Sequence, residues 1–369
     1  MNENISADAR ISALRGMGVA GAANAAAAAG YAAVTERYRE LYWSVPGPQL
    51  YEAACGHVRL GVGLLQAGGG SAARAADLAG AVARSAMLAG RIAFFDLQAP
   101  QDSAWYYEIG VAAAHEAGDP ALAAAVLAHH AFIPAYAGRR EPARALIGQA
   151  QAMINPDFSA LQKSWMWAVA SEIEAKLGAG QAAVAAAGRA REALGQDAAG
   201  VAEGSDTARM SDDISTQSTI NAQSYADDAS RSTAGTEIAA DGEVPGWLDF
   251  FDGGRLAGFL GFAHLSAGAP GPAYAALQQS LDALPAAAVK QRAVVLADLA
   301  AAALATDEVE HCASLLDQAL GIVTDHWYAT AMRRIQAVHG ALVPYKSVRT
   351  VREFDERLAV FRDALPENA

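Results

Sequence analysis

Residues 16–21 have the spacing G-x-G-x-x-G that is typical of dinucleotide-binding loops. That chemistry needs a buried strand before the loop and a helix after it, because the glycines bring the pyrophosphate onto a helix N-terminus. The preceding residues, ISALR, are too few and too polar for a buried parallel strand, and no strand–helix–strand pattern follows. In a chain with 34 glycines the spacing is expected by chance. The sequence therefore predicts no nucleotide cofactor.

Other reactive side chains also lack the arrangement that chemistry needs. The acidic pairs within residues 197–244 have neither the regular spacing nor the glycine of a calcium loop. His129 and His130 are neighbours on an expected helix, so their side chains diverge by about 100° and cannot chelate one metal ion. Cys312 beside His311 is only a weak hint of a reactive thiol, at a position expected to pack. We expect no catalytic residue, metal or cofactor, and a binding protein rather than an enzyme.

Small residues recur about every forty positions, where one predicted helix gives way to the next: Ala99, Gly138, Gly178, Gly268 and Asp307. Five positions after most of them comes another small residue, Ala or Cys. Two-helix units offset by 39 or 40 residues are typical of α-solenoids of the tetratricopeptide type and their longer relatives. The abundance of Ala favours closely packed helices. The predicted fold is all-α, a right-handed α-solenoid of tetratricopeptide-like helix pairs with a period of about 40.

One segment interrupts this period. The interval from Gly178 to Gly268 exceeds one period by about fifty residues, and the excess lies at 197–244. This segment holds ten acidic and two basic side chains and has no sustained apolar period, so it cannot offset its ordering entropy and is predicted to be a disordered acidic insertion. The predicted divisions are an N-terminal helical cap (1–70), repeats (71–196), the insertion (197–244), further repeats (245–323) and C-terminal capping helices (324–369).

Charge and cysteine content limit the classes of partner. The formal net charge is −13, from 27 basic and 40 acidic side chains. Neutralising phosphates needs a basic surface, so we expect no direct DNA binding. Two cysteines without a paired spacing fit a reducing cytoplasm, which is the predicted localisation. The Ala-rich stretch at 16–34 contains Asn24 and almost no Leu, Ile or Phe, so no signal peptide or membrane span is expected.

The predicted concave face carries the candidate binding residues. In an array of this type the first helix of each pair lines the concave groove. In this register the groove combines aromatic rings with isolated charges, at Phe132, Tyr136, Trp165, Glu172, Lys176, Arg255 and Phe262. Such a surface suits a peptide or a small amphiphile. The alternative is that aromatic residues at helical spacing fill the core, which is expected for about half of them.

Three segments carry a resemblance to a known family: EAGDPALAAAVLAHHAFIPAYAGRREPARALIGQAQ, WLDFFDGGRLAGFLGFAHLSAGAPGPAYAALQQSLDALP, and QRAVVLADLAAAAL followed by ASLLDQAL. Over about residues 71–340 the chain resembles the tetratricopeptide-repeat region of XRE-type transcriptional regulators from Streptomyces-like actinobacteria. The resemblance implies that the repeats sense a ligand or a partner. Those regulators bind DNA through an N-terminal helix-turn-helix, which is not expected before residue 71 here, so DNA binding is not carried over. No catalytic residues transfer.

Two functions stay open. In the first, the chain is a cytoplasmic regulator or scaffold that grips a peptide or a partner protein in its groove, with secondary metabolism or development as the regulated process. In the second, it is an enzyme or small-molecule-binding protein with a pocket inside the superhelix, lined by Trp165, Trp167, Phe250, Phe251 and Asp252. An open groove with scattered aromatic residues favours the first function. A pocket closed on all sides that contains a perturbed Asp or His favours the second.

Overall fold

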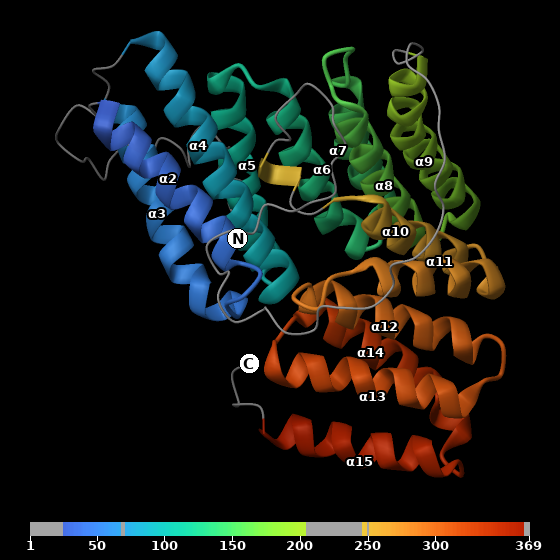
Figure 1. The fold of residues 1–369 in the computed structure, drawn as a ribbon. Coiled ribbons are helices and arrows are strands. Elements are labelled where there is room, and N and C mark those ends of the chain that lie inside the picture. Colours follow the sequence, from blue (N-terminus) through green and yellow to red (C-terminus); the bar gives the residue numbers. More distant parts are fainter. Residues whose placement is uncertain (1–24, 68–70, 204–245, 249–250, 365–369) are drawn as a thin grey trace, which may run out of the picture.

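The computed structural model describes residues 25–67, 71–203, 246–248 and 251–364, and every regular element in these ranges is a helix (Figure 1). The all-α prediction is confirmed. The α-helices are α2 (Ala25–Leu41), α3 (Gly47–Ala67), α4 (Ala72–Arg91), α5 (Pro100–Ala117), α6 (Pro120–Tyr136), α7 (Arg140–Ala152), α8 (Ala160–Lys176), α9 (Gly180–Glu203), α10 (Gly253–Ser266), α11 (Pro270–Ala283), α12 (Val289–Leu304), α13 (Val309–Asp325), α14 (Ala329–Ala341) and α15 (Arg349–Ala364). Three short helices of other pitch are the π-helix η1 (Ile92–Asp96) and the 3₁₀ helices η2 (Gly246–Leu248) and η3 (Val343–Tyr345).

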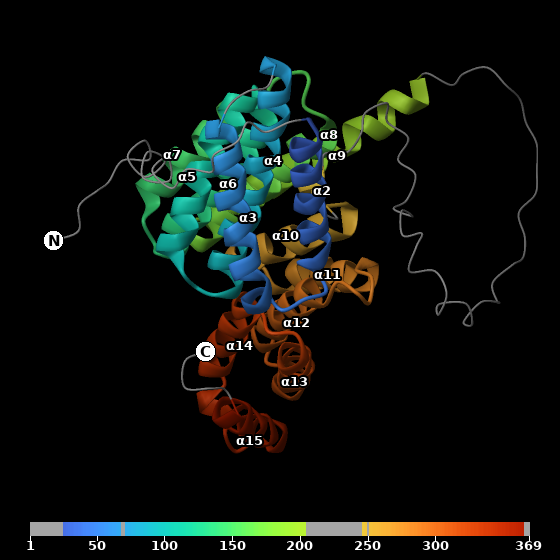
Figure 2. The same cartoon turned by 90° about the vertical axis from the view of Figure 1, so that its left-hand side faces the viewer.

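The helices pack as successive neighbours in two groups. Helices α2 to α9 stand side by side in the N-terminal group, and α11 to α15 lie crosswise below them, with α10 at the bend (Figure 1). Figure 2 shows the same two groups from the side. The most extensive contacts are within the pairs α4–α5, α8–α9, α10–α11 and α12–α13. The bend leaves one side of each group facing the other.

Tight turns join the paired helices. Gly138, Gly178 and Gly268 have φ of 68°, 72° and 72°, and Asp307 has φ of 62°. These four predicted turn residues are therefore in the left-handed region, which glycine adopts without the steric cost of a Cβ. At Gly138 the turn is closed by bonds from Gly138 N to Ala135 O (3.0 Å) and from the next amide to a carbonyl of the preceding turn.

In the turn before α5 the left-handed residue lies one position earlier than predicted. This residue is Gln98 (φ 56°), whereas Ala99 is more extended, at φ −104° and ψ 76°. Ala99 precedes Pro100, and the proline ring disfavours a helical conformation in the residue before it. Gly118 (φ 68°) forms a similar turn between α5 and α6 that the forty-residue period did not predict.

Small residues form the contacts between paired helices. The second helix of each of these pairs buries apolar residues against the first: Ala143, Ile147, Ala150, Ala183, Ala187, Ala190, Ala273, Leu277, Cys312, Leu316 and Ala319. The alanines among them let the helix axes approach closely. Burial raises the pKa of the Cys312 thiol to about 12, so this thiol is not activated as a nucleophile.

Two boundaries of the sequence prediction can be compared with the structure. Helix α9 continues to Glu203, so it extends into the predicted insertion 197–244. Residues 204–245, and the G-x-G-x-x-G segment at 16–21, lie outside the described residues.

One stretch of the described residues, Ala72–Asp96, is long and apolar enough to cross a membrane. In the fold 83% of its apolar window is buried, and this is the environment of a core helix. The stretch is therefore weak evidence for a membrane span.

A buried ion pair joins the two groups of helices. Lys290 Nζ of α12 lies 2.8 Å from Asp96 Oδ1 of η1, and Tyr42 OH donates to the other carboxylate oxygen at 3.0 Å. Lys290 also donates to Tyr42 O (3.0 Å). Lys290 is 4% exposed and Asp96 is fully buried. Burial raises the pKa of Asp96, and the ammonium of Lys290 opposes this shift.

The backbone of η1 makes two further bonds to the C-terminal group. Thr330 Oγ1 donates to Phe95 O (3.1 Å) and Trp327 Nε1 donates to Asp96 O (3.2 Å). The carbonyls at a helix end have no partner within the helix, and here side chains at and just before the start of α14 supply one. The last turn of the α4–η1 segment is thus held by α12 and α14.

We predict opposite effects for two Gly→Ala substitutions in one helix pair. Gly138→Ala places a Cβ on a left-handed residue and should lower the free energy of unfolding by about 1–2 kcal/mol. Gly148→Ala, at an exposed site inside α7 with no atom within 4 Å of the new Cβ, should raise it by about 0.5–1 kcal/mol. Urea unfolding measures both, and equal shifts would contradict the assigned turn.

Lys290→Met should lower the free energy of unfolding by about 3–5 kcal/mol, because it leaves the Asp96 carboxylate buried without its cation. Adding Asp96→Asn should recover part of this loss, since a neutral amide costs less to bury. Lys346→Met, at an exposed position, is the matched control. Chemical unfolding of the four proteins tests this, and a loss below about 1 kcal/mol in Lys290→Met would contradict the role of the pair.

Candidate functional site

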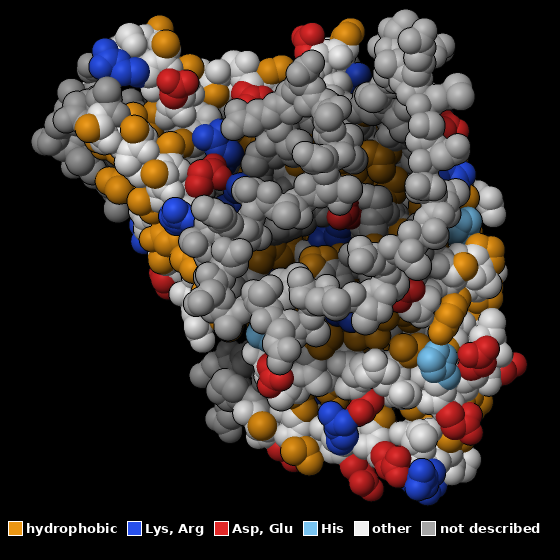
Figure 3. All heavy atoms as spheres, in the orientation of Figure 1, with side chains coloured by type: hydrophobic (Ala, Val, Ile, Leu, Met, Phe, Trp, Pro, Cys, Tyr) orange, Lys and Arg blue, Asp and Glu red, His pale blue; other side chains and the backbone are white. Residues whose placement is uncertain are grey.

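A pocket of about 160 Å³ lies between the two groups of helices. Figure 3 shows hydrophobic side chains, with a few basic and acidic ones, in the hollow between the upright and the crosswise helices. The pocket is lined by Tyr42, Trp43, Arg91, Phe95, His129, Phe132, Trp165, Val169, Glu172, Trp247, Leu248, Phe251, Arg255, Gly258, Phe259, Phe262, Ser280, Leu284, Gln291, Val294, Val295, Asp298, Tyr328, Thr330 and Arg334. They come from elements throughout the described chain, from the end of α2 to α14.

Aromatic rings form much of the wall. Phe95 packs edge-to-face on Phe132, with ring centroids 5.4 Å apart. His129 lies 5.3 Å from Trp165, and Trp165 is edge-on to Trp247 at 5.4 Å. Edge-to-face pairs hold each ring in one orientation. The wall is therefore a preformed apolar surface on which a planar ligand can pack.

A charged network forms another part of the wall. Arg334 Nη2 donates to Glu172 Oε1 at 2.8 Å, and its Nη1 donates to Asp298 Oδ2. Tyr136 OH donates to the same Glu172 oxygen at 3.1 Å. Burial lowers the pKa of Arg334, but the two carboxylates outweigh it and the net pKa is raised. Burial raises the pKa of Asp298, and the neighbouring guanidinium of Arg334 opposes this shift. One guanidinium thus connects α8, α12 and α14.

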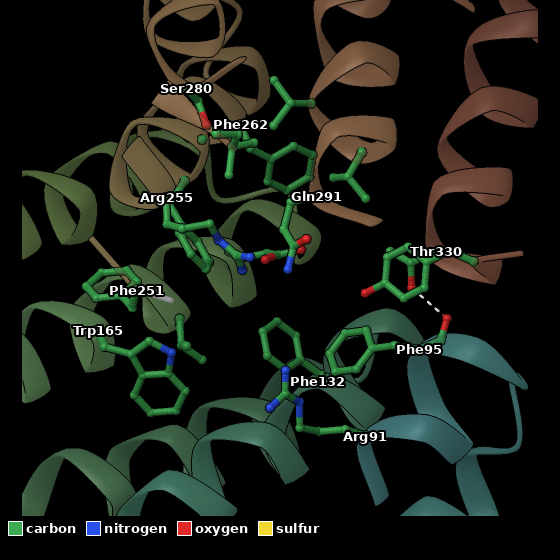
Figure 4. A pocket seen from close by; sticks show the side chains of 18 of the residues that line it. Arg91, Phe95, Phe132, Trp165, Phe251, Arg255, Phe262, Ser280, Gln291 and Thr330 are labelled. Carbon is green, nitrogen blue, oxygen red and sulfur yellow. Dashed lines mark hydrogen bonds between the residues drawn. The ribbon is translucent and has the colours of Figure 1, made fainter. Parts of the chain in front are cut away.

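Two further arginines reach into the pocket from different sides (Figure 4). Arg91, at the end of α4, lies over the rings of Tyr42 and Trp43, at 5.1 and 5.5 Å from their centroids. Arg255 comes from α10, and burial lowers the pKa of its guanidinium. With the Gln291 amide oriented so that both of its polar atoms are paired, its oxygen accepts from Arg255 Nη1 at 2.6 Å.

His129 is a neutral hydrogen-bonding group in this wall. Its Nδ1 lies 2.9 Å from Ala125 O, so Nδ1 carries the proton and Nε2 is left as an acceptor. Burial, with a contribution from Arg91, lowers the pKa of His129 to about 3. The imidazole is a weak base at neutral pH, and it can accept a bond from a ligand without becoming charged.

The structure brings the seven sequence-predicted residues together. Five of them line the pocket: Phe132, Trp165, Glu172, Arg255 and Phe262. The other two lie directly behind this wall. Tyr136 donates to Glu172, and Lys176 Nζ lies over the rings of Tyr136 and Phe262 at 4.6 and 4.7 Å. Burial lowers the pKa of Lys176 to about 8.

Among the described residues, only two of the five predicted for the alternative pocket line it. Trp165 and Phe251 line the pocket. Trp167 instead lies under Arg189, whose guanidinium carbon is 4.7 Å from its ring. Asp252 is exposed and caps α10 by accepting from Arg255 N (2.8 Å). Phe250 lies outside the described residues.

Sequence reasoning missed several polar lining residues, including Arg91, Gln291, Asp298 and Arg334. A signal existed for three of them. Arg91 ends the apolar helix α4, and Asp298 lies within the apolar run of α12. Arg334 is one of two adjacent arginines in α14. A charge inside an otherwise apolar helix is expensive to bury unless it is paired. Such a charge therefore indicates a buried ion pair or a binding site.

The sequence matches no protein-family model, and it matches no curated protein. Among the residues that the structure describes, no group of three His, Cys, Asp or Glu side chains could hold a metal ion. The geometry of the site determines what it can bind. It offers stacking surfaces, guanidinium donors and neutral hydrogen-bonding groups, which together suit ligand binding.

We predict that His129 contributes to a loss of stability in acid. The pKa of His129 is about 3 in the folded state and about 6.5 in the unfolded state. The stability that depends on neutral His129 is therefore fully present above pH 6.5 and is lost as the pH falls toward 3. Between pH 7 and pH 5 the free energy of unfolding should fall by about 2 kcal/mol less in His129→Asn than in the parent protein. His326→Asn, at an exposed position, is the control in urea unfolding, and equal pH slopes in all three proteins would contradict the assignment.

Proposed function

We propose that this chain is a small-molecule-binding protein whose pocket encloses a ligand of about one aromatic ring. The observation that carries the proposal is that elements from both ends of the described chain line one cavity of about 160 Å³. A cavity of about 150 Å³ is known to accommodate benzene. Ordered aromatic rings and few polar groups are the usual composition of a small-molecule site.

The proposed scaffold is a right-handed, tetratricopeptide-like α-solenoid with a period of about 40. The spacing of left-handed turn residues supports it: 40 residues separate Gly138 from Gly178, and 39 separate Gly268 from Asp307. Mainly the first helix of each pair supplies the pocket, as a concave inner face would. In this proposal the array curves far enough for its C-terminal helices to contact η1.

This closure favours a small ligand over a peptide. An extended peptide needs a groove that is open along its length. Here Lys290 of α12 and Thr330 of α14 bond to η1 across the interior. A peptide or protein partner, the other expected class, would bind elsewhere on the array. We further propose that a bound ligand shifts the contacts between the two helix groups, which is how a cytoplasmic regulator of this type would signal to a partner protein.

The proposal predicts saturable binding of one-ring compounds in this pocket. Trp165 and Trp247 lie in its wall, so binding should change the tryptophan fluorescence. We would titrate benzoate, benzamide and benzylamine into the purified protein, and at least one should bind. Val294→Phe places a ring in the pocket and should weaken that binding about tenfold or more.

Val360→Phe adds the same ring at a position in α15 that is 71% exposed and should leave the binding unchanged. The proposal would be wrong if none of the three compounds gave a saturable signal. It would also be wrong if both variants bound as the parent protein does.

A further inference from the structure

We infer that the ligand of this pocket is an organic monoanion, a carboxylate on a ring-sized apolar body, with its carboxylate held by Arg255. This inference rests on the proposed function and adds the chemical class of the ligand. Three features of the described residues carry it: the engagement of Glu172 and Asp298 by Arg334, the environment of Arg255, and an unpartnered hydroxyl.

Both described carboxylates of the pocket wall are already engaged. Glu172 and Asp298 line the pocket together with Arg255 and Arg334. Arg334 bonds to both of those carboxylates. Buried charges in proteins are usually paired, because an isolated ion in a low-dielectric interior is costly. Neither of these carboxylates forms an ion pair with Arg255, so a ligand carboxylate is free to do so.

The guanidinium of Arg255 faces the pocket without a described carboxylate beside it. Among the described residues, no acidic side chain forms an ion pair with its guanidinium, and its side-chain hydrogen bond goes to the neutral Gln291. Arg91 acts electrostatically against the charge of Arg255, whereas Asp252 and Glu172 favour it without forming an ion pair with the guanidinium. The guanidinium fork matches a carboxylate bidentately. In Figure 4 the Arg255 guanidinium extends into the space that Trp165, Phe132 and Phe95 border.

Ser280 is a second polar group that lacks a partner. Its side chain lines the pocket, it is 1% exposed, and its Oγ has no hydrogen-bond partner among the described residues. A buried hydroxyl without a partner costs about 1–3 kcal/mol. A ligand oxygen within reach of Ser280 Oγ would accept or donate the missing hydrogen bond. The aromatic wall then accounts for the apolar body of the ligand.

The charge of the ligand is tested with probes of similar shape. Benzoate should bind the parent protein about tenfold or more tightly than benzamide, and benzylamine should bind most weakly. Phenyl phosphate, with nearly two negative charges at neutral pH, should bind more weakly than benzoate. Isothermal titration gives the four affinities.

Two variants locate the anion at Arg255. Arg255→Gln should reduce the affinity for benzoate about tenfold or more and leave that for benzamide within about threefold. Gln291→Glu places a carboxylate within reach of Arg255 without removing it. It should reduce benzoate binding to a similar extent and raise the Tm of the unliganded protein by about 2 °C. Gln318→Glu, at an exposed position in α13, is the matched control.

The outcomes separate this inference from the proposed function. If benzamide or benzylamine binds in the pocket as tightly as benzoate, the pocket binds ligands but the anion is wrong. The same conclusion follows if phenyl phosphate binds best, or if Gln291→Glu binds benzoate as well as Gln318→Glu does. If no probe binds at all, the proposed function itself is wrong. Should Arg255→Gln fail to fold, Gln291→Glu still decides the question.

Discussion

The buried ion pair between Lys290 and Asp96 is the contact on which the rest of this structure depends. Helix pairs that pack only on their neighbours define an open array, because each pair is held by local contacts. The Lys290–Asp96 ion pair joins residues 194 positions apart and brings α12 against η1. Its geometry is unusually complete, since Tyr42 supplies both a hydroxyl donor and a backbone acceptor. A buried pair repays its desolvation only when its other hydrogen bonds are satisfied, and this one has them. The cavity lies between the two groups of helices that this contact helps to hold together.

The π-helical turn at η1 explains why the closure occurs there. A π-turn widens a helix locally and often accompanies a functional site. Here it places the Asp96 carboxylate inside the molecule, where Lys290 reaches it, and the carbonyls of Phe95 and Asp96 accept side-chain bonds from Thr330 and Trp327. Arg334 adds a second link across the interior, from α14 to α8 and α12. Charges thus join the two groups of helices, whereas Ala and Leu contacts build each pair. Apolar packing is non-directional, whereas charged hydrogen bonds require one geometry. Apolar contacts therefore suffice within each helix pair, and charged contacts fix how the two groups meet.

Much of the fold followed from local signals in the sequence, whereas the closure did not. Gly138, Gly178, Gly268 and Asp307 mark turns because a left-handed residue is needed there, and the small residues five positions on are buried as expected. Phe132, Trp165, Glu172, Arg255 and Phe262 could be placed on inner faces because helical periodicity specifies direction. Periodicity does not specify which helices meet when they are far apart in the sequence. Nothing near Asp96 or Lys290 in the sequence indicates that they meet. Arg91 and Arg334 could be singled out as charges in largely apolar helices, but their place in one pocket follows only from that contact.

The same closure bears on the environment of Arg255. A site that is open to water can leave a guanidinium solvated, and no counter-ion is needed. With α12 and α14 held against η1, the half-buried Arg255 side chain faces the pocket, while Glu172 and Asp298 are already bonded to Arg334. In the proposed function this guanidinium is kept for the ligand, and local costs of this kind are characteristic of binding sites rather than of structural cores. A ligand whose carboxylate pairs with Arg255 would stabilise the closed arrangement in which it is bound. Ligand binding and the contact between the two helix groups are then parts of one equilibrium.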